Sequence, residues 1–377
     1  MLKKEIFSLL EQLGQLHLAE GVEALSLTEQ TDFLQQLKTL PSSLLQEQRS
    51  LLHSKPVVTP WEPVEEFDKP DPSFFLEGQL QIASGKTACL ILAGGQGSRL
   101  GFSEPKALFP ITAVRQKTLL QLLCEKTRAA SHAYNTPLQI ALMASPLNYT
   151  TLKDYLHKNH YFGLSSSQVH LFVQEMAPFL NDEESWFLQA PGKIAAGPDG
   201  NGHALKKLVQ SGIAKKWKDQ GIEMINILPI DNPLADPFDA ALFGYHALKS
   251  HDATLKAILR TDPSEKIGLI VRKNGRLAVQ EYSEVSFPNG TPLAYIGLLC
   301  LRLSWIEQIA PLELPWHLAR KQLIWKYEHF LFDALHYTDR SDVLVFPRED
   351  IFAPLKNPSD ILAVQQALPP DDYISIK

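Results

Sequence analysis

The chain of 377 residues carries 36 Lys and Arg against 42 Asp and Glu, a formal net charge of −6 at pH 7. This balance argues against nucleic acid or an anionic membrane as a partner, although an acidic protein can still hold a local basic pocket. No stretch approaches the roughly 18 apolar residues of a membrane span, and the amino-terminus lacks the apolar core of a signal peptide. Three dispersed cysteines are too few for a disulfide framework or a zinc site and fit a reducing cytoplasm.

Residues 1–54 are rich in leucine and glutamine, with apolar residues at helical spacing, for example Ile6, Leu9, Leu10 and Leu13. This spacing predicts two or three amphipathic helices that pack on the main domain as scaffold. Residues 55–72 are rich in proline and acidic residues and predict an irregular connector. We therefore place an amino-terminal helical segment and its linker at residues 1–84.

Residues 85–310 alternate between apolar strands and helical segments. Strand patterns run over 88–92, 140–143, 169–173 and 225–228, and helix patterns over 118–131, 150–158, 203–220 and 238–249. The alternation predicts an α/β domain with a mostly parallel, doubly wound, Rossmann-like sheet and helices on both faces. Ligands of such sheets bind beyond the carboxyl ends of the strands.

Two further elements complete the chain. Residues 268–282 centre on Asn274-Gly275, a tight-turn pair between apolar runs, and predict a β-hairpin. Residues 311–377 are expected to form a short α+β segment that completes the site. It should contain a helix, a β segment at 343–346 and a loop at 348–357.

A glycine-rich loop follows the strand pattern at 88–92. Gly94, Gly95 and Gly97 remove side chains where backbone N–H groups must approach an anion, and glycine can adopt the positive φ that turns such donors inward. Arg99 and Lys106 add fixed positive charge, which suits phosphate oxygens. The loop therefore predicts a phosphate-binding site at the end of this strand.

The common phosphate loops do not match this sequence. A P-loop needs Gly, four residues and then Gly-Lys-Ser/Thr, and no such string occurs. The dinucleotide pattern is imitated by Gly95, Gly97 and Gly101, but the spacing differs and Arg99 would crowd a pyrophosphate. A dinucleotide-dependent oxidoreductase would also need an acidic ribose ligand about twenty residues further on. Glu125 is the residue there, and it falls within a predicted helix.

Asp231 ends the apolar run 225–230 and so brings a carboxylate to the carboxyl edge of the predicted sheet. A hard oxygen ligand suits Mg²⁺, which commonly takes one or two carboxylates and completes its shell with water and substrate phosphate. The structural alternative is that Asp231 caps a helix starting after Pro233, since Asp is common before helices. Both interpretations remain open on the residues alone.

The string Leu92-Ala93-Gly94-Gly95-Gln96-Gly97-Ser98-Arg99-Leu100-Gly101, followed by Pro105-Lys106, resembles the nucleotide-binding signature of UTP:sugar-1-phosphate uridylyltransferases, the UDP-sugar pyrophosphorylases. Its residues are most similar to those of the eukaryotic-type UDP-N-acetylglucosamine and UDP-N-acetylgalactosamine pyrophosphorylases. Further strings resemble the family in the family's order, at residues 157–164, 198–202, 231–232, 281–284 and 348–357.

The resemblance implies an enzyme that makes UDP-sugar and pyrophosphate from UTP and a sugar 1-phosphate, with Mg²⁺ as cofactor. A phosphate oxygen of the sugar attacks the α-phosphorus of UTP, so positioning and charge neutralisation carry most of the catalysis. The resemblance assigns Arg99 to the pyrophosphate portion, Lys106 to the α-phosphate and Lys326 to the sugar phosphate. It also implies Asp231 as metal ligand.

Base and sugar recognition follow from the same resemblance. The nucleotide-binding residues are the loop residues Leu92, Ala93, Gly94, Gly95 and Gly97, together with Gln174 and Gly200, which read the uracil edge. An amide suits uracil because it both donates and accepts. Asn201, Gly268 and Glu281 match the sugar-binding residues. On sequence alone residues 198–202 could equally be a turn, because Pro-Asp-Gly and Asn-Gly are strong turn formers.

The sugar is the open part of this prediction. Where the N-acetylhexosamine enzymes have Asn-Ala-Gly-Asn, this chain has Tyr295-Ile296-Gly297-Leu298, so both asparagines are replaced. Losing a partner for a buried polar group can change discrimination by orders of magnitude. N-acetylglucosamine 1-phosphate is the leading substrate, and glucose or galactose 1-phosphate, or a broad sugar range, is the alternative.

A second class of function is a nucleotide-sugar-binding regulatory protein with little turnover. The altered sugar motif and the short tail favour it, whereas the retained Arg99, Lys106, Asp231 and Lys326 argue against it. Family members usually continue into a longer carboxyl-terminal domain, and this sequence stops some twenty residues past Asn357. We therefore form no expectation about the oligomeric state.

Overall fold

The computed structural model describes residues 1–54, 60–262, 264–281, 293–321 and 323–370. Contacts within the chain divide it into two compact units, each built from three stretches of sequence. The small unit comprises residues 1–58, 175–202 and 314–330, and the large unit comprises residues 59–174, 203–313 and 331–377. We describe each unit by itself. The three consecutive domains expected from the sequence stay a prediction.

The small unit begins with three α-helices, α1 (Leu2–Gln12), α2 (Leu27–Thr39) and α3 (Leu44–His53), with two 3-10 turns between the first two. The expected amphipathic helices are therefore confirmed. Their apolar faces pack against residues of the other two stretches, including Trp186, Ile194 and Tyr327. Gln48 of α3 fixes this packing, because it accepts from Trp186 Nε1 at 2.8 Å and donates to the Pro178 carbonyl at 3.0 Å.

Short strands form the rest of the small unit, in three antiparallel pairs. The sequence does not predict the hairpin of β14 (Trp316–Lys321) and β15 (Ile324–His329). It predicts a helix in the tail without giving its bounds, and the tail contains the 3-10 helix η6 (Leu331–Tyr337) of the large unit. The alternation that marks a strand is masked in the hairpin by Trp, His and charged residues on both faces. The other pairs are β5 (Met176–Pro178) with β8 (Ala196–Pro198) and β6 (Leu188–Ala190) with β7 (Lys193–Ile194).

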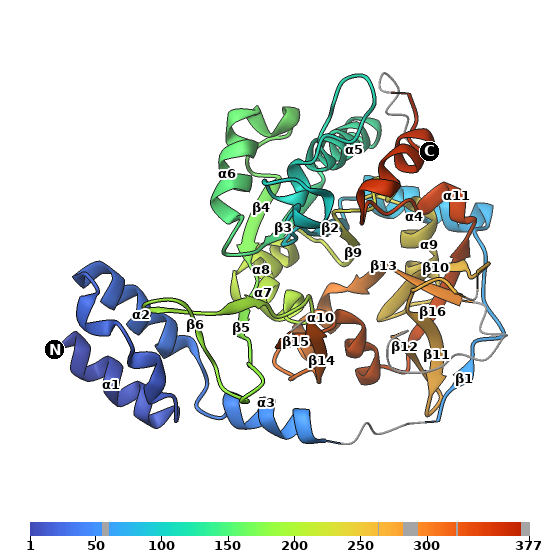
Figure 1. Ribbon diagram of the computed structural model, residues 1–377. Coiled ribbons are helices and arrows are strands. Elements are labelled where there is room, and N and C mark those ends of the chain that lie inside the picture. Colours follow the sequence, from blue (N-terminus) through green and yellow to red (C-terminus); the bar gives the residue numbers. More distant parts are fainter. Residues whose placement is uncertain (55–59, 263, 282–292, 322, 371–377) are drawn as a thin grey trace. The chain divides into compact units, whose positions relative to one another are not determined.

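Within the described residues, the large unit contains a mixed sheet of ten strands. Figure 1 shows how these strands are arranged. Its parallel part runs in the order β9-β2-β3-β4, with bounds Met224–Pro229, Thr87–Leu92, Gln139–Ala144 and Val169–Val173. These strands confirm the four strand patterns of the α/β domain. Strands β2, β3 and β9 are buried along nearly their whole length, which explains their continuous apolar runs, whereas β4 is only partly buried. Because they are parallel, their carboxyl ends meet at one edge of the sheet.

The other part of the sheet is largely antiparallel. Strand β13 (Leu293–Arg302) pairs with β9, with β11 (Leu269–Lys273) and with β10 (Ala253–Leu259), while β16 (Ser341–Phe346) lies parallel to β10. β11 and β12 (Arg276–Gln280) form the predicted hairpin, and Asn274 and Gly275 both have positive φ, as a type I′ turn requires. The short β1 (Glu62–Pro63) pairs with β11.

Helices of the large unit follow the strands. The predicted helices appear as α5 (Leu119–Ala133), α6 (Tyr149–Lys158) and α9 (Ala240–Leu248). The segment expected as one helix at 203–220 is two, α7 (Ala204–Gln210) and α8 (Ile213–Asp219), because Gly212 between them has φ +79°. The remaining helices are α4 (Pro72–Ala83), α10 (Leu303–Ile309), α11 (Arg348–Ile351) and α12 (Ile361–Ala367), with 3-10 turns η3–η7 at 98–100, 106–108, 160–163, 331–337 and 358–360.

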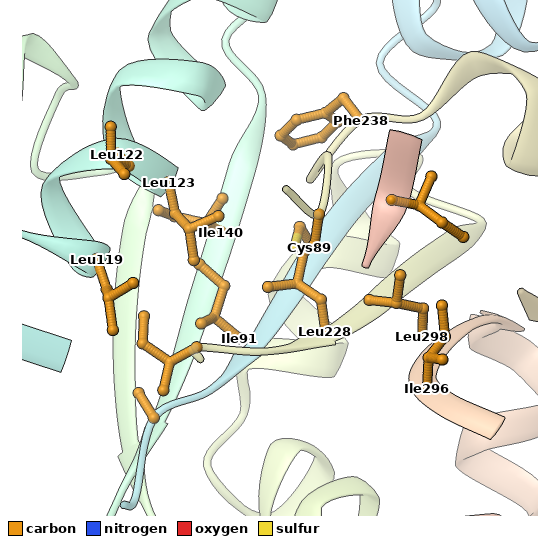
Figure 2. Packing of buried hydrophobic residues seen from close by; sticks show 14 of the residues in the cluster. Cys89, Ile91, Leu119, Leu122, Leu123, Ile140, Leu228, Phe238, Ile296 and Leu298 are labelled. Atoms are coloured by element: carbon orange, nitrogen blue, oxygen red, sulfur yellow. The ribbon is translucent and has the colours of Figure 1, made fainter. Parts of the chain in front are cut away.

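Apolar side chains from strands and helices form a hydrophobic core cluster in the large unit. Figure 2 shows Cys89 and Ile91 of β2 beside Leu228 of β9, with Leu119 and Leu123 of α5 over the neighbouring strands. Leu298 of β13, one of the residues that replace the family's asparagines, belongs to this core and is 2% exposed. No helix in the described part of the chain is long and apolar enough to cross a membrane.

Two glycines let helices α4 and α9 touch backbone to backbone. A Cβ added at Gly78 would lie 1.8 Å from the Ala240 carbonyl oxygen, and one at Gly244 would lie 1.7 Å from the Phe74 carbonyl oxygen. No side chain fits at either position. Neither glycine carries a sequence signal of this role, because the contact joins helices far apart in the chain.

Candidate active site

The parallel strands of the large unit bring four loops to the carboxyl edge of the sheet. Ala93 follows β2, Ser145 follows β3, Gln174 follows β4 and Asp231 follows β9. The backbones are tied together there, since Ala93 N donates to Met143 O at 2.8 Å and Ile230 N donates to Leu92 O at 3.1 Å. The glycine loop, Gln174 and Asp231 are therefore neighbours in one unit.

The glycine loop has a different physical basis from the one expected. Gly94, Gly95 and Gly97 all lack positive φ, so the expected left-handed conformation is wrong for these three residues. Close packing explains why two of these positions are glycine. A Cβ at Gly94 would lie 2.5 Å from Gln174 Oε1, and a Cβ at Gly97 would lie 2.6 Å from the Glu104 carbonyl oxygen. A Cβ at Gly95 would meet nothing within 4 Å, so close packing does not require glycine there.

Lys106 and Asp231 form an ion pair beside this loop. Lys106 Nζ donates to Asp231 Oδ2 at 3.2 Å and to the Leu355 carbonyl at 3.3 Å. The two side chains are 12% and 23% exposed, so solvent and ligands can reach the pair while water screens it only in part. The backbone N–H of Lys106 also donates to the Gly95 carbonyl at 3.2 Å. The predicted α-phosphate cation and the predicted metal ligand thus lie together.

Asp231 does not cap the following helix. The N-cap of α9 is Asp239, whose Oδ1 accepts from Leu242 N at 3.1 Å. The structural alternative raised for Asp231 is therefore wrong. Its carboxylate stays at the sheet edge, with one oxygen on Lys106.

Arg99 lies in the exposed turn η3, which Gly101 ends with φ +66°. Among the residues that the structure describes, no hydrogen bond or ion pair involves its guanidinium. A cation left without a carboxylate partner is available to an anionic ligand. The position of Arg99 on the same loop as Gly94–Gly97 agrees with the expected phosphate contact, which stays a prediction.

Gln174 is 7% exposed and lies against the backbone of Gly94, as the short distance to an added Cβ shows. Its backbone N–H donates to the Ala144 carbonyl at 2.8 Å, which fixes it at the end of β4. In the described part of the chain its side-chain amide makes no hydrogen bond. Both the donor and the acceptor of that amide are thus available beside the glycine loop.

Asn148 supports the loop and was not singled out from the sequence. Its Nδ2 donates to the Ala93 carbonyl at 2.9 Å, and its Oδ1 accepts from Ser145 N at 2.8 Å. The side chain is 1% exposed, so it bridges the ends of β2 and β3 from within. In the sequence, an Asn at the start of a helix indicates an ordinary N-cap. The hydrogen bonds that join the ends of β2 and β3 become visible only in the fold.

Lys126 of α5 supports the loop after Asp231 in a similar way. Its Nζ donates to the carbonyls of Pro233 and Ala235 at 2.7 and 2.9 Å. Burial lowers the pKa of Lys126 to about 8, and the charge of Asp236 opposes part of this shift. A lysine within an amphipathic helix gives no sequence signal of this role.

Gly268, Glu281 and Tyr295 lie together in the large unit. The Gly268 carbonyl accepts from Tyr295 N at 2.8 Å, and a Cβ at Gly268 would lie 3.4 Å from Glu281 Oε1. Burial and the negative charges of Glu281 and Asp333 raise the pKa of Tyr295, so its phenol keeps its proton at neutral pH. Two predicted sugar-binding residues thus have a phenol donor nearby.

The remaining predicted residues belong to the small unit. Gly200 has φ +88°, and a Cβ there would lie 2.2 Å from the His329 carbonyl oxygen, so both conformation and space require glycine. That carbonyl accepts from Asn201 N at 3.1 Å, which ties residues 200–202 to β15. Lys326, three residues earlier on β15, pairs with Glu328 at 2.7 Å. Gly200 and Asn201 are therefore tied to β15, the strand that carries Lys326, which the turn interpretation alone does not predict.

Comparisons with known proteins identify the family of this chain. The model of the UTP–glucose-1-phosphate uridylyltransferase family matches residues 59–290. Arabidopsis thaliana UDP-N-acetylglucosamine diphosphorylase 2 is 30% identical over 330 residues, which cover 78% of this chain and 66% of that protein. Xenopus tropicalis UDP-N-acetylhexosamine pyrophosphorylase-like protein 1 is 29% identical over 316 residues, which cover 74% and 62%. The chain thus spans somewhat less than two thirds of the length of these relatives.

A solved structure shares the fold. The uridine diphosphate N-acetylglucosamine pyrophosphorylase of Trypanosoma brucei, solved with an inhibitor, superimposes with a TM-score of 0.82 at 24% identity. The superposition covers 97% of this chain and 84% of that one. Since the family model matches more than half of its residues, this chain belongs to the UTP–glucose-1-phosphate uridylyltransferase family.

Proposed function

We propose that this protein transfers the uridylyl group of UTP to a sugar 1-phosphate, which gives UDP-sugar and releases pyrophosphate. The observation that carries the proposal is the Lys106–Asp231 pair at the carboxyl edge of the sheet, beside a glycine loop whose Arg99 has no partner in the described residues. This edge offers two cations and a carboxylate where a nucleoside triphosphate would place its phosphates. Family membership supports the same reaction.

In the proposed reaction the sugar phosphate oxygen forms a bond to the α-phosphorus of UTP, and the bond to the β-phosphate oxygen breaks. Lys106 would contact the α-phosphate and Arg99 the departing pyrophosphate, since both charges lie at the loop. Gln174 would read uracil through its free amide. Leu92, Ala93, Gly94, Gly95 and Gly97 would bring backbone groups to the nucleotide.

Enzymes of this family generally use a divalent metal ion. The donor set fits one, because Asp231 presents a hard, partly exposed carboxylate at the same edge. We propose Mg²⁺, held by Asp231 and by phosphate oxygens of the substrates. The ion would neutralise the negative charge of the phosphates. Lys106 would keep the Leu355 carbonyl as its acceptor while the carboxylate of Asp231 is engaged.

In the large unit we propose Gly268 and Glu281 as sugar-binding residues. In the small unit we propose Asn201 as a sugar-binding residue, Lys326 as a contact of the sugar phosphate and Gly200 as a contact of the base. The Glu281 carboxylate can accept from sugar hydroxyls, and the Gly268 backbone lies next to it. Names of the relatives support N-acetylglucosamine 1-phosphate as substrate. The buried Leu298 and the protonated Tyr295 favour a hexose 1-phosphate as second candidate, because neither supplies an amide to an acetamido group.

Pyrophosphate release tests the proposal. The purified chain is given UTP, Mg²⁺ and one of N-acetylglucosamine, N-acetylgalactosamine, glucose or galactose 1-phosphate, with ATP and dTTP as nucleotide controls. Release with UTP and one sugar supports the proposal and identifies the sugar. If no sugar 1-phosphate gives pyrophosphate release while the protein still binds UTP, the result points to a regulatory nucleotide-sugar-binding protein. The proposal includes neither nucleic acid nor a membrane as partner, and the cytoplasm remains our expectation for the compartment.

A further inference from the structure

Asn232, the residue after Asp231, is fully buried and uses both ends of its side-chain amide. Nδ2 donates to the Ile351 carbonyl at 2.7 Å, and Oδ1 accepts from Ala353 N at 3.1 Å. Its side chain therefore holds residues 351–353 against the end of β9. An amide meets both demands, whereas a carboxylate would face the Ile351 carbonyl with no donor.

The same segment continues to Lys106. Leu355 N donates to the backbone carbonyl of Asp231 at 2.8 Å, and the Leu355 carbonyl accepts from Lys106 Nζ at 3.3 Å. Residues 351–355 are thus bound at both ends to the loop that carries Asp231. The position of the Leu355 carbonyl, one of the two acceptors of Lys106, depends on these bonds.

Apolar packing alone does not fix this register. Ile351 and Leu355 are buried in the core, but apolar burial is non-directional and each of its contacts is weak. Two hydrogen bonds from one buried amide define the distance from β9 to the segment far more narrowly. Arg348, which pairs with Glu265 at 2.9 Å, fixes the start of the segment from another side.

We propose that Asn232 is a positioning residue for Lys106. By fixing residues 351–353 it places the Leu355 carbonyl, and this carbonyl holds the Lys106 ammonium at the sheet edge independently of the carboxylate of Asp231. The proposal deepens the function proposed above and rests on it for its catalytic consequence. Its geometric part, the control of Lys106 by Asn232, stands on contacts of the ligand-free chain.

The test compares Asn232→Asp with Gln168→Glu. Gln168 is a matched control because its amide is also buried and also bridges backbone groups, donating to the Leu138 carbonyl at 2.9 Å and accepting from Ser165 N at 3.0 Å. It lies in the loop before β4, at the opposite end of that strand from Gln174. Asn232→Ala and Gln168→Ala repeat the comparison without an added charge, in case the buried carboxylate prevents folding.

Two readouts separate positioning from general destabilisation. The first is the rate at which an amine reagent labels Lys106, followed by mass spectrometry of the folded protein. We expect Asn232 variants to label Lys106 several-fold faster, whereas Gln168 variants of equal melting temperature label it at the wild-type rate. The second is steady-state kinetics of pyrophosphate release. We expect kcat to fall by about 10-fold or more with little change in KM for UTP, because small displacements of a catalytic group can cost up to about 100-fold.

The outcomes are distinguishable. Unchanged labelling of Lys106 in both Asn232 variants overturns the proposal, and so does a loss of kcat no larger than that of the Gln168 variants. Faster labelling together with a lower kcat supports it. If the wild-type chain releases no pyrophosphate with any sugar while labelling still accelerates, the positioning of Lys106 by Asn232 stands and the proposed function fails.

Discussion

Lys106 Nζ lies 3.2 Å from Asp231 Oδ2, which joins two residues that are 125 positions apart in the sequence. The contact places a predicted phosphate-binding cation on a predicted metal ligand at the carboxyl edge of the sheet. A ligand that engages both residues must replace this ion pair with contacts of its own. The pair thus keeps these two charges satisfied before the substrates enter.

Replacing Lys106 by alanine tests the cation. We expect turnover to fall by roughly 100-fold or more, because a positioned donor to developing charge is commonly worth that much. The fold should persist, since the ion pair with Asp231 is partly exposed and the other contact of Lys106 Nζ is a single hydrogen bond to the Leu355 carbonyl. Pyrophosphate release measures the loss, and Lys249→Ala is the control, because Lys249 pairs with Asp68 at 3.3 Å in the same unit. Near-normal turnover of Lys106→Ala would remove Lys106 from the mechanism.

Asp231→Asn tests the carboxylate with little change of shape. We expect the concentration of Mg²⁺ needed for half-maximal activity to rise at least 10-fold, since second-sphere changes alone typically cost 10–100-fold in metal affinity and here the ligand itself is altered. UTP binding measured without a divalent ion should be retained or strengthened, because Lys106 loses its anionic partner. A metal titration that matches the wild type would exclude Asp231 as the metal ligand.

The glycine loop offers a graded series. Gly94→Ala should displace the Gln174 amide, since the added Cβ would lie 2.5 Å from Oε1 of a flexible side chain, and should weaken UTP binding with a small loss of stability. Gly97→Ala should instead lower the free energy of unfolding by about 1–3 kcal/mol, because its Cβ would meet the Glu104 backbone at 2.6 Å.

Gly95→Ala is the stability control of this series, because its Cβ would meet nothing within 4 Å. Calorimetry and thermal unfolding on the three variants check the order. Equal losses of stability in all three would show that packing does not distinguish these glycines.

The contact between helices α4 and α9 gives a stability prediction outside the site. We expect Gly244→Ala to lower the free energy of unfolding by about 1–3 kcal/mol or more, because the methyl group would overlap the Phe74 carbonyl. Leu80→Ala on α4 is the control, since Leu80 is 63% exposed. Denaturant unfolding compares the two. A Gly244→Ala variant as stable as Leu80→Ala would mean that the helices lie further apart.

His170 of β4 should make the protein less stable in acid. Burial, with a smaller contribution from the charge of Lys216, lowers the pKa of His170 to about 4 in the folded protein. In the unfolded chain the same imidazole has its ordinary pKa of 6.5. Between these values the unfolded state binds more protons, so stability is lost as pH falls from about 6.5 to about 4 and levels off below. His170→Gln should flatten the pH dependence of the unfolding free energy there by up to about 1.4 kcal/mol per pH unit. Parallel pH curves for both proteins would contradict this.

Local patterns in the sequence predict much of the large unit. The strand at 169–173 coincides with β4, and the helix at 118–131 lies within two residues of α5, because buried strands and amphipathic helices reveal themselves over short windows. The glycine loop and Asp231 likewise follow strands whose direction the alternation predicts. The ends of parallel strands then place these residues at one edge.

Non-local contacts explain what the sequence does not predict. The small unit combines three distant stretches, and nothing in residues 175–202 or 314–330 alone indicates that they cover the helices at the amino-terminus. Asn148, Lys126 and Asn232 act through buried hydrogen bonds to backbone groups of other loops. The steric role of Gly94 depends on Gln174, 80 residues away. The glycine motif was therefore correctly identified, but the physical reason expected for it, a positive φ, was wrong.

The fate of the phosphates of UTP tests the central claim most directly. We would supply the wild-type chain with Mg²⁺, the sugar 1-phosphate selected by the panel and UTP labelled at the α-phosphate, and separate the products. We expect the label to appear in UDP-sugar in step with an equal amount of unlabelled pyrophosphate, and Lys106→Ala to slow both together. Label in UMP or UDP without UDP-sugar, from correctly folded protein, would contradict it.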